Sequence, residues 1–172
     1  MRPDVLTNGF RFVLLCALQV FIFKDMNVML GGLVPLHILL YPLFILLLPI
    51  DMPSYVVLLL GFATGLLIDL FYDSLGVHTS ATVFLAFLRK ASINFQQPKG
   101  GYTRDHPTFQ DQSVGWFFRY ATPLLALHLL FYFLVEAFNV YLFPMALLKT
   151  LVSFTATFVF VALYMFIFNP KA

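Results

Sequence analysis

Long apolar stretches separated by short polar breaks organise the whole chain. The stretches approach the length that an α-helix needs to cross a bilayer, about 20 predominantly apolar residues. The breaks are rich in Pro, Gly and Asp, which mark turns rather than helix interiors. The pattern predicts six helices, over residues 5–23, 34–48, 54–72, 79–95, 114–138 and 144–168. The predicted fold class is therefore an all-α membrane protein, a six-transmembrane-helix bundle that forms a single domain over residues 1–172.

The predicted second helix, residues 34–48, is the shortest of the six. With a rise of about 1.5 Å per residue, it is short for a hydrocarbon core of about 30 Å. Pro35 suits the first turn of a helix and Pro49 ends the run. Pro42 lies inside the segment and should kink it. We expect a tilted or irregular helix that packs among its neighbours.

Two polar links differ sharply in length. Residues 49–53 form a short turn, which implies an antiparallel hairpin between the helices that it joins. Residues 96–113 form the longest polar segment, with Pro and Gly breakers and balanced charges. We interpret this loop as a solvated connector. The alternative is that Phe95, Tyr102 and Phe109 dock a cytoplasmic partner or lie on the membrane surface.

Composition excludes the soluble classes of protein. Charged residues make up 10% of the chain, hydrophobic residues 61%, and the mean hydropathy is +0.91. Globular domains carry about 25% charged residues. These values exclude a soluble enzyme, a nucleic-acid binder and a disordered chain. The single cysteine, Cys16, excludes an internal disulfide, and the net charge of +2 is too small to indicate a polyanionic partner.

The basic residues predict an orientation in the membrane. Six spans place both termini, the 49–53 turn and the 96–113 loop on the same side. With its flanks, that side carries Arg2, Arg11, Arg89, Lys90, Lys99, Arg104, Arg119 and Lys171, against Lys24 and Lys149 on the other. Because Lys and Arg concentrate in cytoplasmic segments, we expect both termini and the long loop in the cytoplasm. The determinants nearest to helix ends are Arg89, Lys90 and Arg119.

The predicted helix 54–72 carries a line of small residues that ends on a carboxylate. Gly61, Gly65 and Asp69 are spaced by four, so they share one helical face. The small-xxx-small pattern allows two helix backbones to approach closely in lipid. Two interpretations follow: packing inside the bundle, or contact with the transmembrane helix of a partner. Gly61, Gly65 and Asp69 are the candidate residues for the partner contact.

Three ionisable residues are predicted at the same outer level of the membrane. An ionisable group inside a span costs about 2.5–3.5 kcal/mol at the centre. Asp69, Glu136 and Lys149 lie near the outer ends of their predicted helices. We expect Lys149 to neutralise Glu136, Asp69 or both. Such an intramembrane polar network would tie three helices together as a structural clamp.

Evidence for catalysis in the sequence is thin. Gly65-x-x-x-Asp69-x-x-x-Asp73 matches the second half of the signature of the CDP-alcohol phosphotransferases, whose aspartates bind divalent metals. The first half is missing, because residues 55–60 contain no carboxylate. The histidines, among them His78, are scattered, and we favour hydrogen-bonded packing clusters over ligand sites for them. The sequence therefore predicts a protein that is not an enzyme, with no catalytic residue, no metal and no cofactor.

Residues 61–91, GFATGLLIDLFYDSLGVHTSATVFLAFLRKA, resemble the central region of the rod shape-determining protein MreD family in the form found in Bacteroidota. That family pattern is Gly-x-x-x-Gly-x-x-x-Asp, a short outer turn with Gly-x-His, and a small-residue helix ending in Leu-Arg. Further similarities are Arg11-Phe-x-Leu-Leu with Gln19, the Leu-Leu-Pro turn at 47–49, and Trp116-Phe-Phe-Arg119-Tyr with a downstream Leu-x-Glu136-Ala-Phe. The resemblance covers almost the whole chain.

The resemblance implies a non-enzymatic scaffold of the bacterial cell-elongation machinery, which makes lateral-wall peptidoglycan. Proteins of this family sit in the bacterial inner membrane and bind MreC. Through MreC they link to MreB, to RodA and to RodA's partner transpeptidase. The family's bundle is similar in fold to the substrate-binding subunits of energy-coupling-factor transporters. That similarity leaves one alternative open, a subunit that binds or transports a vitamin-like small molecule, because fold alone does not establish function.

Overall fold

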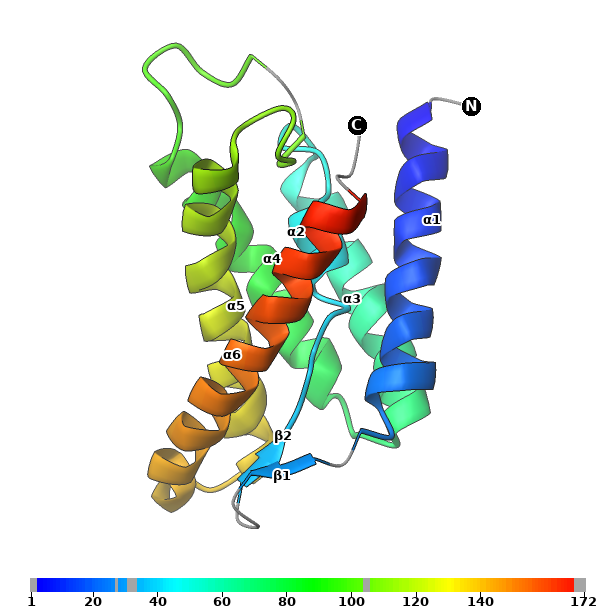
Figure 1. The fold of residues 1–172 in the computed structure, drawn as a ribbon, viewed down its shortest axis with the longest axis vertical. Coiled ribbons are helices and arrows are strands. Elements are labelled where there is room, and N and C mark those ends of the chain that lie inside the picture. The colour runs from blue at the N-terminus through cyan, green and yellow to red at the C-terminus, as the bar shows by residue number, and fades with distance from the viewer. Residues whose placement is uncertain (1–2, 27, 31–33, 104–105, 169–172) are drawn as a thin grey trace.

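The computed structural model describes residues 3–26, 28–30, 34–103 and 106–168 as a helical bundle with one small hairpin (Figure 1). Its long helices are α1 (Pro3–Leu18), α3 (Ser54–Tyr72), α4 (Val77–Phe95), α5 (Val114–Ala137) and α6 (Phe143–Phe168). The shorter elements are η1 (Gln19–Phe23), a π-helical turn that continues α1, α2 (Leu43–Leu46) and η2 (Val140–Leu142). Strands β1 (Val28–Leu30) and β2 (Val34–Leu36) pair antiparallel, with Met29 opposite Pro35.

Four helical segments within the described residues are long and apolar enough to cross a membrane. They are Leu6–Phe23, Ser54–Tyr72, Val114–Ala137 and Phe143–Phe168. Many of their large apolar side chains are exposed, among them Phe21, Leu70 and Phe166. Exposed apolar surface on this scale suits lipid rather than water. The chain is therefore a mostly helical, multi-pass membrane protein.

The prediction of a helix over residues 34–48 is wrong. After β2 the chain remains extended to residue 40, and the helix that follows a turn at 41–42 is α2, which has four residues. Pro42 lies immediately before α2 as its N-cap. In a continuous helix, the Pro42 ring would clash with the carbonyl of Ile38 and would remove a hydrogen bond. The proline therefore ends the extended segment instead of kinking a helix.

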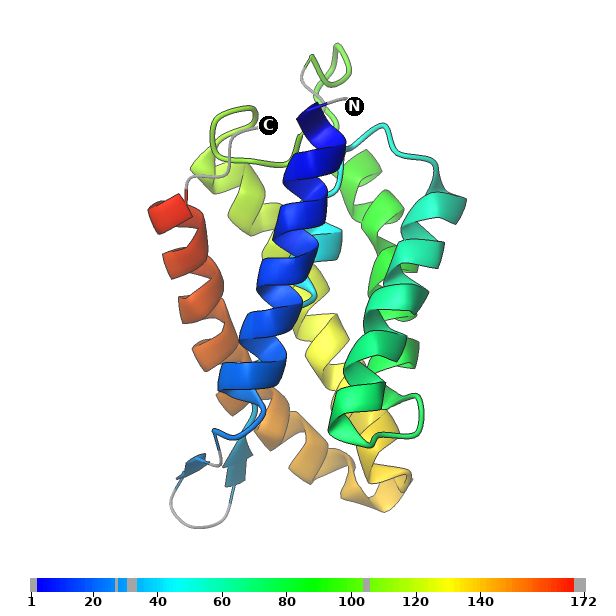
Figure 2. The ribbon, with the colours of Figure 1, turned by 90° about the vertical axis from the view of Figure 1, so that its right-hand side faces the viewer.

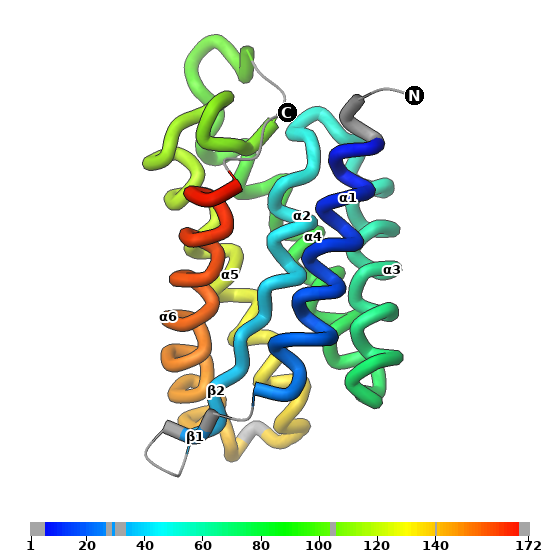
Figure 3. Tube along the Cα trace, turned by 45° about the vertical axis from the view of Figure 1, so that its right-hand side comes forward, coloured from blue at the N-terminus to red at the C-terminus, as the bar shows by residue number. Residues whose placement is uncertain are grey.

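The extended segment lies in the middle of the bundle, where its backbone needs partners other than water. Figure 3 shows it rising from β2 to α2 between α1 and α6. Gln19 accepts from the backbone amide of Leu40 (2.8 Å) and donates to the carbonyl of Ile38 (3.0 Å). From α6, Ser153 Oγ accepts from the amide of His37 (3.0 Å), and Thr157 Oγ1 accepts from the amide of Leu39 (3.1 Å). Non-helical backbone at membrane depth persists where protein satisfies it in this way.

The connecting segments divide between the two ends of the bundle. The start of α1, the end of α6, the 49–53 turn and the loop between α4 and α5 lie at one end (Figures 1 and 2). The hairpin, the α3–α4 turn and the α5–α6 connection lie at the other. The loop packs on the bundle, with ring centroids 5.8 Å apart for Tyr102 and Trp116 and 5.4 Å apart for Phe109 and Phe117. Its two aromatics thus cover the bundle end, and Phe95 stays exposed.

Candidate functional site

The face of α3 that carries Gly61 and Gly65 packs against α4. A Cβ atom at Gly65 would lie 2.4 Å from the Cα of Thr79, and one at Gly61 would lie 3.1 Å from the Cβ of Ala86. Both glycines are buried. Their missing side chains let α3 and α4 approach closely, as expected of small residues in a membrane helix pair. Of the two interpretations of these glycines, packing inside the bundle agrees with the structure, because α4 of the same chain covers that face and leaves no room there for a partner helix.

Asp69 holds the start of α4. Its Oδ1 accepts hydrogen bonds from Ser74 Oγ (2.5 Å) and the His78 amide (3.0 Å). Its Oδ2 accepts from the amide and the hydroxyl of Thr79, at 2.8 and 2.5 Å. The first amides of a helix have no partner within the helix and favour a negative charge. A carboxylate from the preceding helix therefore caps α4 and closes the α3–α4 turn.

The polar network predicted for Asp69, Glu136 and Lys149 divides into two separate sites. Lys149 Nζ lies 2.9 Å from Glu136 Oε2, and both side chains are partly exposed. Asp69 is buried, and its hydrogen bonds go to the α3–α4 turn and the first residues of α4. Of the predicted alternatives, Lys149 therefore pairs with Glu136 and not with Asp69, and the expected tie between all three helices is wrong. Main-chain amides and hydroxyls stabilise the Asp69 carboxylate instead.

A cluster of buried aromatic and imidazole groups joins the extended segment to α4 and α5. The hydroxyl of Tyr41 lies 3.1 Å from His78 Nδ1 and 3.4 Å from His128 Nε2. His128 Nδ1 lies 3.0 Å from the carbonyl of Ala81, and Thr82 Oγ1 lies 3.3 Å from the Tyr41 hydroxyl. All of these side chains are buried. The cluster fixes Tyr41, and with it the extended segment, between helices.

Arg89 is an internal anchor as well as a basic residue at a helix end. Its Nε donates to Tyr120 Oη (3.0 Å), and its Nη2 donates to the carbonyls of Leu48 and Pro49. These bonds tie α4 to α5 and to the residues that follow α2. The side chain is 3% exposed. Of the predicted topology determinants, Lys90 is exposed, and Arg119 makes a local bond to the Gly115 carbonyl.

An apolar groove of about 780 Å³ lies between α1 and α3. One wall is formed by Asn8, Gly9 and Phe12, the other by Leu60, Ala63 and Thr64, with Phe44 of α2 also lining the groove. At the opposite end of α1, η1 joins α3 through a hydrogen bond of 2.7 Å from Gln19 Nε2 to Tyr72 Oη. The two spans are thus held together at one end of the bundle and separated by the groove toward the other.

Sequence reasoning missed this groove, because it forms between helices that do not follow one another along the chain. Gly9 and Ala63 were the available signal, as small residues within two apolar runs. A Cβ at Gly9 would meet no other atom within 4 Å, so this glycine leaves open space beside α1. Gly65, by contrast, has a crowded neighbourhood. The position of a glycine in the sequence does not distinguish open space beside a helix, as at Gly9, from a close helix contact, as at Gly65.

Comparison with family models, curated proteins and solved structures finds no match to this chain. Within the described residues, no group of three or more His, Cys, Asp or Glu side chains is arranged to hold a metal ion. Asp69 has its oxygens bonded to the α3–α4 turn, and Asp73 ends α3 in a left-handed conformation with φ 51°.

Proposed function

We propose that this chain is a non-enzymatic membrane scaffold of the MreD type, which holds the transmembrane helix of MreC in the groove between α1 and α3. The resemblance along almost the whole sequence supports the choice of partner. The groove supports the mode of binding, and it is the observation on which the proposal rests. Through MreC, the chain would join MreB, RodA and its partner transpeptidase in cell elongation.

The walls of the groove have the chemistry that helix association in lipid requires. Lipid tails are as apolar as leucine, so close packing of backbones, rather than hydrophobic burial, drives two helices together. Gly9 on one wall and Ala63 on the other carry small side chains or none, so the backbone of a partner helix can approach closely. Phe12 and Phe44 provide aromatic surface. Both walls belong to segments long enough to span the membrane, Leu6–Phe23 and Ser54–Tyr72. A single apolar helix lying along the groove would restore packing between α1 and α3.

Leucine in place of Gly9 should disrupt partner binding and leave the bundle folded. The added side chain enters the groove, and its Cβ meets nothing within 4 Å in the bundle itself. We expect recovery of MreC with the purified protein from native membranes to fall about ten-fold, the effect of losing 1–2 kcal/mol of helix packing. The matched control is Gly115→Leu, since Gly115 of α5 is equally open and lies outside the groove lining.

The same purification distinguishes the proposed scaffold function from the alternative, a subunit that binds or transports a small molecule. Unchanged recovery of MreC with Gly9→Leu and with Ala63→Leu would contradict the groove as its binding surface. A small molecule that copurifies with the wild-type chain and disappears in Gly9→Leu, with no MreC present, would favour the vitamin-binding alternative instead. Folding of each variant is checked by its unfolding temperature in the same detergent.

We further propose that six segments cross the bacterial inner membrane, in an arrangement like that of the energy-coupling-factor substrate-binding subunits. The extended segment and α2 together run the length of the bundle (Figure 3), which supports counting them with α4 as crossings. The end that carries the loop and the first residues of α1 would face the cytoplasm. The excess of basic residues at that end supports this orientation.

A cysteine at Gly101 tests the orientation. Gly101 lies in the loop between α4 and α5, and the native Cys16 is buried. G101C should react with an impermeant thiol reagent after the cells are opened and remain unlabelled in intact cells. The control is an engineered cysteine at Leu75, an exposed residue in the α3–α4 turn at the opposite end. Labelling of G101C but not of L75C in intact cells would show the opposite orientation, with the loop outside the cytoplasm.

A further inference from the structure

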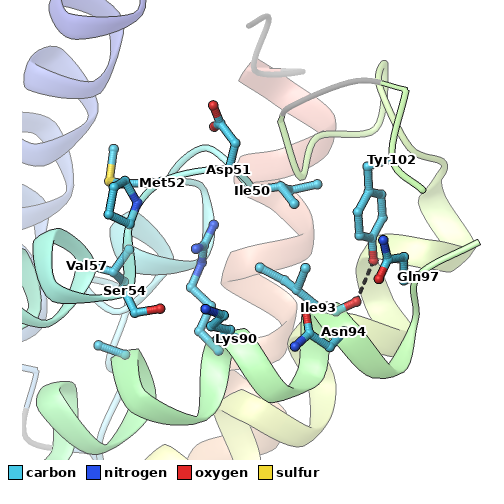
Figure 4. A pocket seen from close by; sticks show the side chains of 13 residues that line it. Ile50, Asp51, Met52, Ser54, Val57, Lys90, Ile93, Asn94, Gln97 and Tyr102 are labelled. Carbon is cyan, nitrogen blue, oxygen red and sulfur yellow. Dashed lines mark hydrogen bonds between the residues drawn. The ribbon is translucent and has the colours of Figure 1, made fainter.

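A second, smaller pocket of about 260 Å³ lies where α3 begins and α4 ends (Figure 4). Arg89, Lys90 and Asn94 of α4 line the pocket, together with Gln97, which follows the helix. Ser54 at the start of α3 also lines it (Figure 4). Tyr102 of the loop closes the pocket, with its hydroxyl bonded at 2.7 Å to the carbonyl of Ile93. Three separate parts of the chain therefore contribute to this pocket.

The pocket offers donors that the protein itself does not use. Two of the three guanidinium nitrogens of Arg89 are bonded, and Nη1 has no acceptor among the residues described. Lys90 is exposed and makes no ion pair within the described part of the chain. No side chain caps the start of α3, so the positive end of a 19-residue helix also faces this region. These groups favour an anion.

The level of the pocket in the membrane indicates which anion it would meet. Ser54 is the first residue of a membrane-spanning helix, so the pocket lies where that span leaves the hydrocarbon. Phospholipid phosphates occupy this level of a bilayer. The lining carries two cations, Arg89 and Lys90, against one carboxylate, Asp51. Apolar side chains, including Ile50, Met52 and Val57, line the same pocket and suit the glycerol and upper acyl region of a lipid.

We propose that this pocket binds the phosphate ester of a phospholipid headgroup, with Arg89 Nη1 and Lys90 Nζ as its main donors. A buried arginine that is already held in place loses little freedom on binding, and guanidinium groups match phosphate geometry. Lys90 adds a mobile charge at the rim. The pocket and the groove between α1 and α3 share the turn residues Asp51, Met52 and Pro53. Lys90 and Asn94 line only the pocket, so substitutions there test this site without depending on the identity of a partner.

Replacement of Lys90 by glutamine tests the site with little risk to folding, because Lys90 is exposed, whereas Arg89 anchors two carbonyls and Tyr120. Delipidated protein in detergent is titrated with short-chain phosphatidylglycerol and followed by native mass spectrometry. We expect Lys90→Gln to weaken binding of the first lipid about five-fold, the contribution of one basic side chain near a membrane surface. Lys99→Gln, at an exposed loop lysine, is the matched control and should bind like the wild type.

A parallel titration with inorganic phosphate distinguishes a lipid from a free phosphate. Displacement of the lipid by millimolar phosphate, with the same loss in Lys90→Gln, would assign the pocket to free phosphate and overturn the headgroup. Equal lipid binding by the wild type, Lys90→Gln and Asn94→Ala would show that the pocket binds no phosphate ester. A loss confined to Lys90→Gln and Asn94→Ala, with phosphate inactive, supports the headgroup site.

Discussion

Replacement of Asp69 by alanine should lower the stability of the folded bundle by about 2–3 kcal/mol, from four hydrogen bonds that each contribute about 0.6 kcal/mol or more between membrane helices. The variant leaves Ser74, His78 and Thr79 without the acceptor that closes the α3–α4 turn. Unfolding of the detergent-solubilised protein by increasing sodium dodecyl sulfate measures the change. The stability of Asp69→Asn should lie between those of the wild type and Asp69→Ala, because the amide oxygen can replace one of the two carboxylate oxygens.

The ion pair at the same end of the bundle provides the control. Lys149 and Glu136 are partly exposed, with side chains 23% and 31% accessible. Pairs of this kind contribute about 0–1 kcal/mol. Lys149→Met should therefore change the unfolding midpoint much less than Asp69→Ala. Equal effects of the two substitutions would mean that Asp69 depends on the lysine after all, and would restore the single network.

The helices with uninterrupted apolar runs could be predicted closely from the sequence. The predicted 54–72 coincides with α3, and the predicted 114–138 and 144–168 differ from α5 and α6 by one residue at one end. These segments are long, and turn residues flank them, so length and breakers decide their limits. The prediction at 34–48 was wrong because its apolar run also suits buried extended chain. Periodicity does not separate the two for a short apolar segment.

The candidate site depends on distances across the bundle, which the sequence does not contain. The spacing of Gly61, Gly65 and Asp69 indicated a common face but not the helix that would cover it. The groups that donate hydrogen bonds to Asp69 belong to residues five to ten positions later. The backbone partners of the Gln19 side chain belong to the segment after the hairpin. Gln19 was visible as a polar residue in an apolar run. Its function became apparent from the extended backbone that it contacts.

Replacement of Gln19 by leucine should have the largest effect on the fold, about 3–5 kcal/mol. Leucine has similar size but leaves the carbonyl of Ile38 and the amides of Leu40 and Tyr41 without their partner. Each buried polar group left unsatisfied costs about 1–3 kcal/mol. The hydrogen bond to the Tyr72 hydroxyl, which joins η1 to α3, is lost as well. Unfolding in sodium dodecyl sulfate and hydrogen exchange of the peptide over residues 37–41 measure both consequences.

Thr157→Val is the control that distinguishes lost hydrogen bonds to the extended segment from a general loss of packing. Thr157 supplies one hydrogen bond, to the amide of Leu39, so its loss should cost about 0.6–1.7 kcal/mol and raise exchange locally. Gln19→Glu keeps an acceptor for the amides of Leu40 and Tyr41 but loses the donor to the Ile38 carbonyl and the Tyr72 hydroxyl. Its stability should lie between those of the wild type and Gln19→Leu. Unchanged exchange over residues 37–41 in Gln19→Leu would mean that α6 alone holds the segment. Increased exchange there, with α3 and α4 still protected, would identify the segment as a separately stabilised part of the bundle. Its main support would then be the Gln19 side chain of η1.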